Sequence, residues 1–166
     1  MSIYGFIILL HVVGTILGAG GATVAEVQIT RALRDKQVSP DEGGLMHLNY
    51  FLIRIGLTFI ISSAFAMVGY HLINDSIQIL LDAKVLFKEF LVVIIIANAV
   101  AIGRRWVPLW LGAAISFTSW WGATVLGVMG PVPFNFFTLL LIYIPTVFVI
   151  ATVLHYTKQV TATSTK

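Results

Sequence analysis

The stretch Ile8-Leu-Leu-His11-Val-Val-Gly14-Thr-Ile-Leu-Gly18-Ala-Gly20-Gly21-Ala22-Thr-Val-Ala-Glu26 decides the fold of this chain. It is apolar and rich in glycine, and it carries one histidine and one carboxylate. An α-helix advances about 100° per residue, which places one stripe of side chains on a common face: His11, Gly14, Gly18, Ala22 and Ala25. Small residues let another helix or a flat ligand approach the backbone closely. The histidine on this stripe is therefore either a ligand or a polar group that needs a partner.

The composition indicates an integral membrane protein. Of the 166 residues, 58% are hydrophobic and only 10% are charged, whereas a globular domain has about 25% charged residues. The net charge of +3 comes from short basic clusters between apolar runs, which is typical of topology signals and not of a nucleic-acid surface. The chain has no cysteine, so disulfides, thiolate zinc sites, thiol catalysis and c-type haem attachment are excluded.

Five apolar runs predict an all-α polytopic bundle of five transmembrane helices in one domain, 1–166. Each run is near the length of about 20 residues that a bilayer requires. The segment Ser39-Pro40-Asp41-Glu42 predicts a capping box, and Asn74-Asp75-Ser76 is a candidate cap for the third helix. The expected helices span residues 3–33, 40–72, 76–103, 108–128 and 134–157.

The basic residues predict the orientation. An odd number of spans places the two termini on opposite sides of the membrane. Lysine and arginine accumulate on the cytoplasmic side, so the sequence predicts an N-out, C-in topology. One side then holds Arg31, Arg34, Lys36, Arg104, Arg105, Lys158 and Lys166, and the other holds Lys84 and Lys88.

Three polar residues are expected at depth on the inner side, namely Glu26, Arg54 and Asn98. Ionisable groups inside a bilayer are costly and require a partner or a purpose. We expect these three residues to meet. A structural ion pair with an amide that fixes helix packing is one interpretation, and a proton or substrate path is the other.

A second polar group is expected in the outer half of the membrane. Histidine with methionine suits copper, and imidazole also binds haem iron. Ammonium groups pair with carboxylates such as haem propionates. Snorkelling lysines, methionine as core filler and interfacial or hydrogen-bonded histidines are the alternatives. The residues concerned are His11, Met67, His71, Lys84, Lys88 and Met129.

Large aromatic side chains are expected near mid-membrane in the fourth helix, where Trp120 and Trp121 follow one another. Trp120 is a candidate wall for a flat ligand. Plain helix packing is the alternative, because Ser119, Ala123 and Gly127 repeat every four residues as a small-residue seam. His47 and His155 fall at the inner interface. A second bis-imidazole site there would make a two-haem protein, and plain interfacial histidines are the alternative.

Several motifs resemble a broad group of small helical membrane proteins. Leu10-His11-x-x-Gly14 with Gly20-Gly21-Ala22 resembles the opening of the copper-resistance D-type membrane proteins and of the short haem-binding membrane protoporphyrinogen oxidases. Ala83-Lys84, leading to Asn98, Arg104 and Pro108, resembles their lysine-bearing helix. A closer similarity is to uncharacterised bacterial multi-helix inner-membrane proteins, in the segments 20–23, 31–35, 39–42 and 116–121.

The resemblance implies a bacterial inner-membrane protein with His11 as a haem ligand and Lys84 as a site residue. Those oxidases carry a further histidine in the lysine helix, which this chain lacks between 83 and 103. We therefore expect a haem b redox or electron-transfer protein, with His11 as axial ligand and His71 as its partner. Whether it is an enzyme is left open.

Two other functions are left open. A transporter or copper-handling protein would use His11, His71 and Met67 as metal ligands. A cofactor-free structural subunit would use its polar residues to fix the bundle. The bilayer is the expected partner in every case, with a homo-oligomer or a redox protein as further candidates.

Overall fold

The computed structural model describes residues 1–35, 38–74 and 77–163, without the side chains of 33–35, 77 and 161–163. These residues form five helices that are long and apolar enough to span a membrane, which confirms the predicted all-α architecture. The side chains of Arg34, Lys36, Asp75, Ser76 and Lys166 lie outside this description. The elements are α1 (Ile3–Asp35), α2 (Pro40–Ile73), the 3₁₀-helix η1 (Ile77–Leu81), α3 (Ala83–Gly103), α4 (Leu109–Val128) and α5 (Phe136–Thr163).

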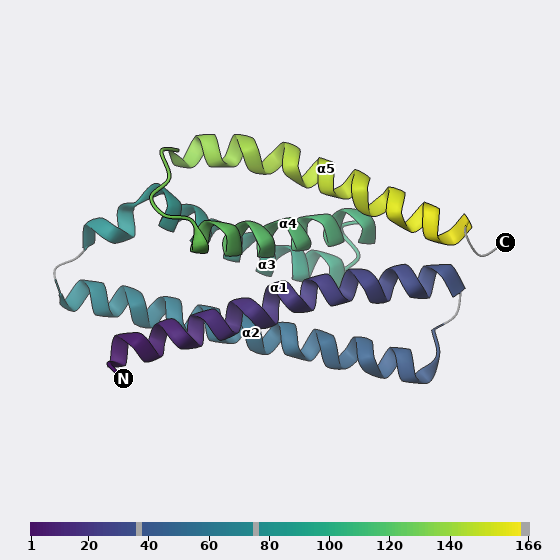
Figure 1. Ribbon diagram of the computed structural model, residues 1–166, viewed down its shortest axis with the longest axis horizontal. Coiled ribbons are helices and arrows are strands. Elements are labelled where there is room, and N and C mark those ends of the chain that lie inside the picture. The colour runs from purple at the N-terminus through teal and green to yellow at the C-terminus, as the bar shows by residue number, and fades with distance from the viewer. Residues whose placement is uncertain (36–37, 75–76, 164–166) are drawn as a thin grey trace.

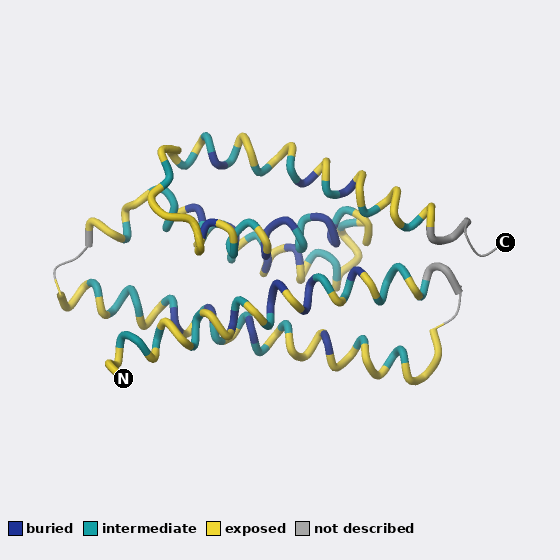
Figure 2. Tube along the Cα trace, viewed as in Figure 1, coloured by how far each residue is buried: buried dark blue, intermediate teal, exposed yellow. Residues whose placement is uncertain are grey.

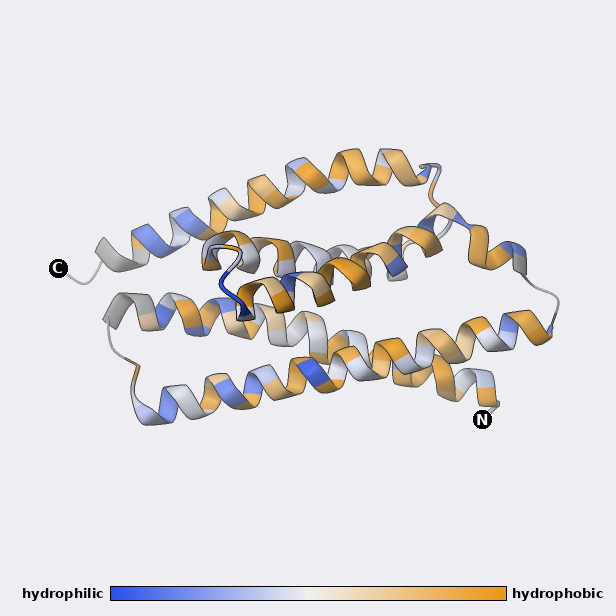
Figure 3. Cartoon of the chain, turned by 180° about the vertical axis from the view of Figure 1, so that it is seen from behind, coloured by the Kyte–Doolittle hydropathy of each residue, from blue (hydrophilic) through white to orange (hydrophobic). Residues whose placement is uncertain are grey.

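The helices run side by side as two antiparallel pairs and a fifth helix (Figure 1). The pair α1–α2 makes the most extensive contact, α3 packs on α4, and α5 packs on α4 and reaches α1. The N-terminus, η1 and the α4–α5 turn lie at one end, called here the N-terminal end. The α1–α2 and α3–α4 connections lie at the opposite end with the C-terminus. Apolar residues dominate the helices between these ends, and the α3–α4 connection is strongly hydrophilic (Figure 3).

The helix predicted over 76–103 is divided, and its predicted start is wrong. Residues 77–81 form η1, and Asp82 caps α3 by accepting a hydrogen bond from the Lys84 N–H at 2.8 Å. Asn74 instead ends α2, where its backbone N–H donates to the Tyr70 carbonyl at 3.2 Å. Asp82 lies directly before the apolar run, so its carboxylate satisfies the first free N–H groups of that helix.

The predicted capping box at the start of α2 is confirmed. The Glu42 N–H donates to the Ser39 hydroxyl at 3.3 Å, and the Ser39 N–H donates to the Glu42 carboxylate at 2.9 Å. Pro40 follows as the first helical residue, where its missing N–H costs nothing. The sequence therefore defined this helix start correctly.

The glycine stripe of α1 brings the backbones of α1 and α2 together. A Cβ atom on Gly14 would lie 2.8 Å from the Gly56 carbonyl oxygen, and a Cβ on Gly56 would lie 2.8 Å from the Gly14 carbonyl oxygen. Side chains larger than hydrogen are excluded at both positions. The close approach predicted for this stripe is therefore made by a neighbouring helix.

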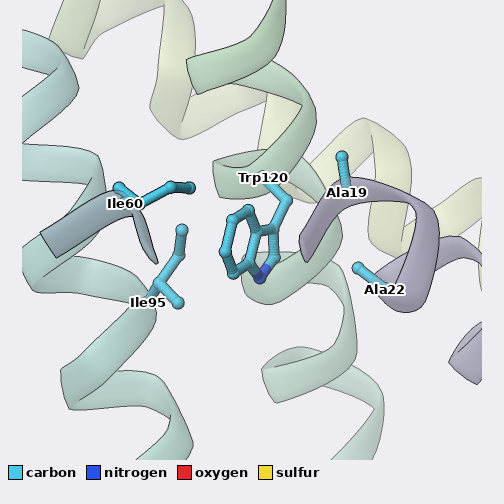
Figure 4. Close-up of a cluster of buried hydrophobic side chains, with 5 residues drawn as sticks. All are labelled: Ala19, Ala22, Ile60, Ile95 and Trp120. Atoms are coloured by element: carbon cyan, nitrogen blue, oxygen red, sulfur yellow. The ribbon is translucent and has the colours of Figure 1, made fainter. Parts of the chain in front are cut away.

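Trp120 of α4 covers the same stripe one turn further along. A Cβ atom on Gly18 would lie 2.0 Å from Cζ3 of the Trp120 indole. The indole is 1% exposed and packs among Ala19, Ala22, Ile60 and Ile95 (Figure 4). Buried residues concentrate along α4 and along the inward sides of α1 and α3 (Figure 2). Trp120 therefore joins α4 to the α1–α2 pair.

Candidate functional site

A cavity of about 520 Å³ lies between the α1–α2 pair and the helices α3 and α4. It extends from Trp120 and Ile60 near the middle of the bundle to Tyr4 and His71 at the N-terminal end, where η1 borders it. Its lining is mainly apolar, and its volume is within the range of about 300–1,000 Å³ for ligand pockets. We call it the histidine cavity. The sequence-predicted site residues that line it are His11, Met67, His71, Lys88 and Trp120.

The helical register explains why these residues meet. In α2, Ser63, Met67 and His71 are spaced by four residues, which places them on one face. In α1, Tyr4 and His11 are two turns apart, which also places them on one face. The close packing of α1 on α2 turns both faces toward the space beside α3. The sequence therefore assembles the cavity from two helical stripes.

The hydrogen bonds of Ser63 determine the tautomer of His11. The Ser63 Oγ lies 2.6 Å from the Phe59 carbonyl oxygen and 3.0 Å from the Ile60 carbonyl oxygen. Both of these partners are acceptors, so the single hydroxyl proton of Ser63 is directed to the backbone. The His11 Nδ1 lies 2.9 Å from the same Oγ and must therefore donate its proton to it.

The neutral His11 ring consequently carries its lone pair on Nε2. No hydrogen bond to this nitrogen occurs within residues 1–35, 38–74 and 77–163. A histidine that ligates a metal typically donates its other ring N–H to an outer partner, which fixes the tautomer and the ring orientation. The His11–Ser63 hydrogen bond has this arrangement. Sequence reasoning missed Ser63, although its position two turns before His71 in α2 was a usable signal.

His71 lies at the mouth of the cavity. Its Nε2 is 3.4 Å from the Tyr4 hydroxyl, and its ring packs edge-on against Tyr4 and Tyr70. Its Nδ1 is buried without a hydrogen-bond partner among the described residues. Tyr4 was not predicted as a site residue.

The two imidazoles lie at different depths in the cavity. His11 is level with Ser63, which is eight residues before His71, or about 12 Å along a helix. Histidine nitrogens lie about 2.0–2.1 Å from a bound metal, so two ligands of one ion are about 4 Å apart. His11 and His71 therefore do not ligate the same iron or copper ion in this arrangement, and the predicted axial pair is not assembled.

The same separation applies to the predicted metal set of His11, His71 and Met67, because its two histidines are about 12 Å apart in depth. No group of three or more His, Asp or Glu side chains suited to hold a metal ion occurs in the described part of the chain. Met67 lines the cavity between the two histidines, one turn from each of Ser63 and His71. His47 and His155, considered for a second haem, are exposed near the opposite end.

The two lysines have different surroundings. Lys88 lines the cavity beside Glu89, and its ammonium makes no ion pair within 4.0 Å in the described ranges. Lys84 does not line this cavity. Its Nζ donates to the carbonyl oxygens of Met129 and Gly130, at 2.5 and 3.2 Å. Lys88 is therefore the cation available to a ligand in the cavity.

The polar residues expected on the inner side do not form one cluster. Glu26 pairs with Lys158 of α5 at 2.9 Å, and Arg54 is exposed with its guanidinium over the Tyr50 ring. Asn98 donates to the Gly112 carbonyl oxygen at 2.7 Å. The prediction that these three meet is therefore wrong, because Glu26 and Asn98 have other partners and Arg54 lies exposed on α2.

Comparison with known proteins gives no match to this chain among family models, curated proteins or solved structures.

Proposed function

We propose that the chain is an integral membrane protein that binds one haem b in the histidine cavity and serves in electron transfer. The observation that carries this proposal is the His11 ring, whose Nδ1 is anchored on Ser63 and whose Nε2 lone pair is free. In haem proteins such an imidazole is a common axial ligand. A bound haem would supply one-electron chemistry.

The remaining groups of the cavity suit such a ligand. Its apolar lining matches a porphyrin face, and its volume of about 520 Å³ admits a ligand of drug size or larger. Lys88 offers an ammonium for a carboxylate. Trp120 is buried and lies at the deep end of the cavity. In this proposal His11 binds the iron, Ser63 orients His11, and Lys88 holds a propionate.

An absorption spectrum of the detergent-purified protein tests the proposal. We expect a Soret band with reducible α and β bands. The band should be lost in His11→Ala and retained in the matched controls His71→Ala and His47→Ala. Ser63→Ala should weaken haem retention by about 10- to 100-fold, the usual effect of losing an outer partner of a metal ligand.

Other outcomes would contradict it. A colourless protein with stoichiometric copper would indicate a copper-handling protein or transporter. A colourless, metal-free protein that co-purifies with other subunits would indicate a structural subunit. An unchanged spectrum in His11→Ala would remove the assigned ligand.

We further propose an N-out, C-in orientation in a bacterial inner membrane. The basic residues separate by the ends of their elements. Arg31 is near the end of α1, Arg104 and Arg105 are in the α3–α4 connection and Lys158 is near the end of α5, whereas Lys84 and Lys88 are in the first turns of α3. The chain has no cysteine, so single introduced cysteines report the topology. A membrane-impermeant maleimide should label Ser2→Cys and Gly130→Cys in intact cells, and Gly103→Cys only after permeabilisation. The opposite labelling pattern would reverse the orientation.

A further inference from the structure

A second apolar site lies on the other side of α4 from the histidine cavity. It is a groove of about 380 Å³ between α3, α4 and α5. Its walls include Leu91, Trp121, Val125 and Tyr143, and Met129 lies at its N-terminal end. Trp121, Val125 and Met129 are exposed, so the groove opens to the surroundings of the bundle. In the proposed membrane orientation, this outer surface of the bundle faces lipid.

The length of the groove matches one lipid leaflet. Its lining runs from Phe117 of α4 to Met129, the residue directly after α4, and twelve steps of helical rise correspond to about 18 Å. The hydrocarbon core of a bilayer is about 30 Å thick, so one leaflet is about 15 Å deep. A single acyl chain therefore fills the groove from the N-terminal end toward the middle of the membrane.

Lys84 places a positive charge at the mouth of this groove. Its ammonium is held by the carbonyl oxygen of Met129, which itself lines the groove, and by that of Gly130. Both acceptors are uncharged, and no carboxylate lies within 4.0 Å of this ammonium in the described residues. An ammonium has three N–H donors, which leaves one for a ligand. An ammonium binds phosphate as a point charge, so a lysine beside an apolar groove between transmembrane helices fits the headgroup of an anionic lipid.

We propose that this groove binds one anionic phospholipid, with its phosphate on Lys84 and one acyl chain between α4 and α5. The site rests on the proposed membrane insertion but not on haem. The lipid would fill the space between the outer turns of α4 and α5, whose interhelical polar contact is the Ser119–Tyr143 hydrogen bond at 2.9 Å.

Native mass spectrometry of the purified protein with added phosphatidylglycerol or phosphatidylcholine tests this site. We expect one tightly retained phosphatidylglycerol and weaker retention of phosphatidylcholine. Lys84→Ala should weaken phosphatidylglycerol binding by about fivefold, the effect of one lysine near an anionic surface. Lys84→Arg should restore it, and Arg105→Ala, at the opposite end, should leave it unchanged.

A groove-filling variant separates headgroup from chain recognition. Val125→Trp should displace both lipids, because a larger side chain occupies the space of the acyl chain. The Soret absorbance of the same samples should stay unchanged in both variants, because neither Lys84 nor Val125 lines the histidine cavity. The lipid proposal and the haem proposal can therefore fail independently. Equal retention by Lys84→Ala and the unchanged protein, or no preference for phosphatidylglycerol, would overturn the lipid site whatever the absorbance.

Discussion

Two neighbouring glycines on α1, Gly18 and Gly20, have different surroundings. Gly18 faces the Trp120 indole, where an added Cβ would lie 2.0 Å from a ring carbon. Gly20, two residues later, has no atom within 4 Å of an added Cβ. The small-residue stripe of α1 was expected to contact another helix or a flat ligand. At Gly18 it contacts the flat indole of Trp120 instead.

We expect Gly18→Ala to destabilise the protein and Gly20→Ala not to. The overlap with a fully buried indole should cost about 1–3 kcal/mol, more than the roughly 1 kcal/mol that alanine gains over glycine in a helix. At Gly20 there is no overlap, so only the gain in helix propensity from glycine to alanine applies. Unfolding of the detergent-solubilised variants by a denaturing detergent, followed by circular dichroism, measures both free energies. Equal stability of the two variants would mean that Trp120 does not pack on Gly18.

The sequence predicted the residues of the cavity better than their partners. His11, Met67, His71, Lys88 and Trp120 line one space because helix periodicity and alternating topology set their heights and faces. The hydrogen bonds depend on how each helix is rotated against its neighbours, which one sequence does not specify. For this reason the sequence did not identify Ser63 as the partner of His11. It also grouped Lys84 with the histidines, whereas the Lys84 ammonium contacts Met129 and Gly130 outside the histidine cavity.

At the scale of elements, the crossing of α1 and α2 positions His11. Gly14 and Gly56 face one another across this crossing, and a Cβ added to either glycine would lie 2.8 Å from the carbonyl oxygen of the other. The His11–Ser63 hydrogen bond lies close to this crossing. The separation of the two backbones therefore controls the ring orientation of the proposed ligand.

Gly56→Ala should separate α1 from α2 and loosen haem retention. The two nearest contacts of the added methyl group are backbone atoms, the Gly14 carbonyl oxygen at 2.8 Å and the Gly18 nitrogen at 2.9 Å, so the helices must move apart. The cost should be about 1–3 kcal/mol. Gly69→Ala, in open space on the same helix, is the matched control. Haem absorbance per protein and denaturant midpoints measure the two effects, and identical values for both variants would contradict the role of the crossing.

The break between η1 and α3 was not foreseen from hydropathy, because the run 77–103 is mainly apolar on both sides of Asp82. Its other polar residues are Gln78, Lys84, Lys88, Glu89 and Asn98. Asn74, Asp75 and Ser76 offered equally good cap chemistry by residue type. Asp82 caps α3 because residues 77–81 form a 3₁₀-helix, so that the α-helix begins only after them. Helix existence could thus be predicted, and the start of α3 could not.

At the scale of the whole molecule, an ion pair connects the first helix to the last. Glu26 is 7% exposed and contacts Lys158 of α5 at 2.9 Å. Both groups lie toward the end opposite the N-terminus. Sequence reasoning placed both residues toward the same side of the membrane but chose Arg54 as the partner, because the proximity of α1 to α5 is a property of the assembled bundle.

We expect Glu26→Met to destabilise the bundle more than the double variant Glu26→Met with Lys158→Met. Removing one partner of a buried pair typically costs about 3–5 kcal/mol, whereas replacing both by apolar residues is often neutral. The free energy of unfolding in detergent gives both values. A single variant as stable as the double variant would mean that the pair is screened by solvent.

The helices α2 and α3 follow one another in the chain, yet no Cα atoms of the two come within 8 Å of each other in the described residues. On this flank α2 and α3 meet through side chains such as Ile60 and Ile95, and η1 borders the cavity at the N-terminal end. Exposed side chains change rotamer in picoseconds to nanoseconds, whereas helices shift in microseconds to milliseconds. We therefore expect the ligand proposed for this cavity to enter through this flank, by side-chain rearrangement and without separation of the packed helix pairs.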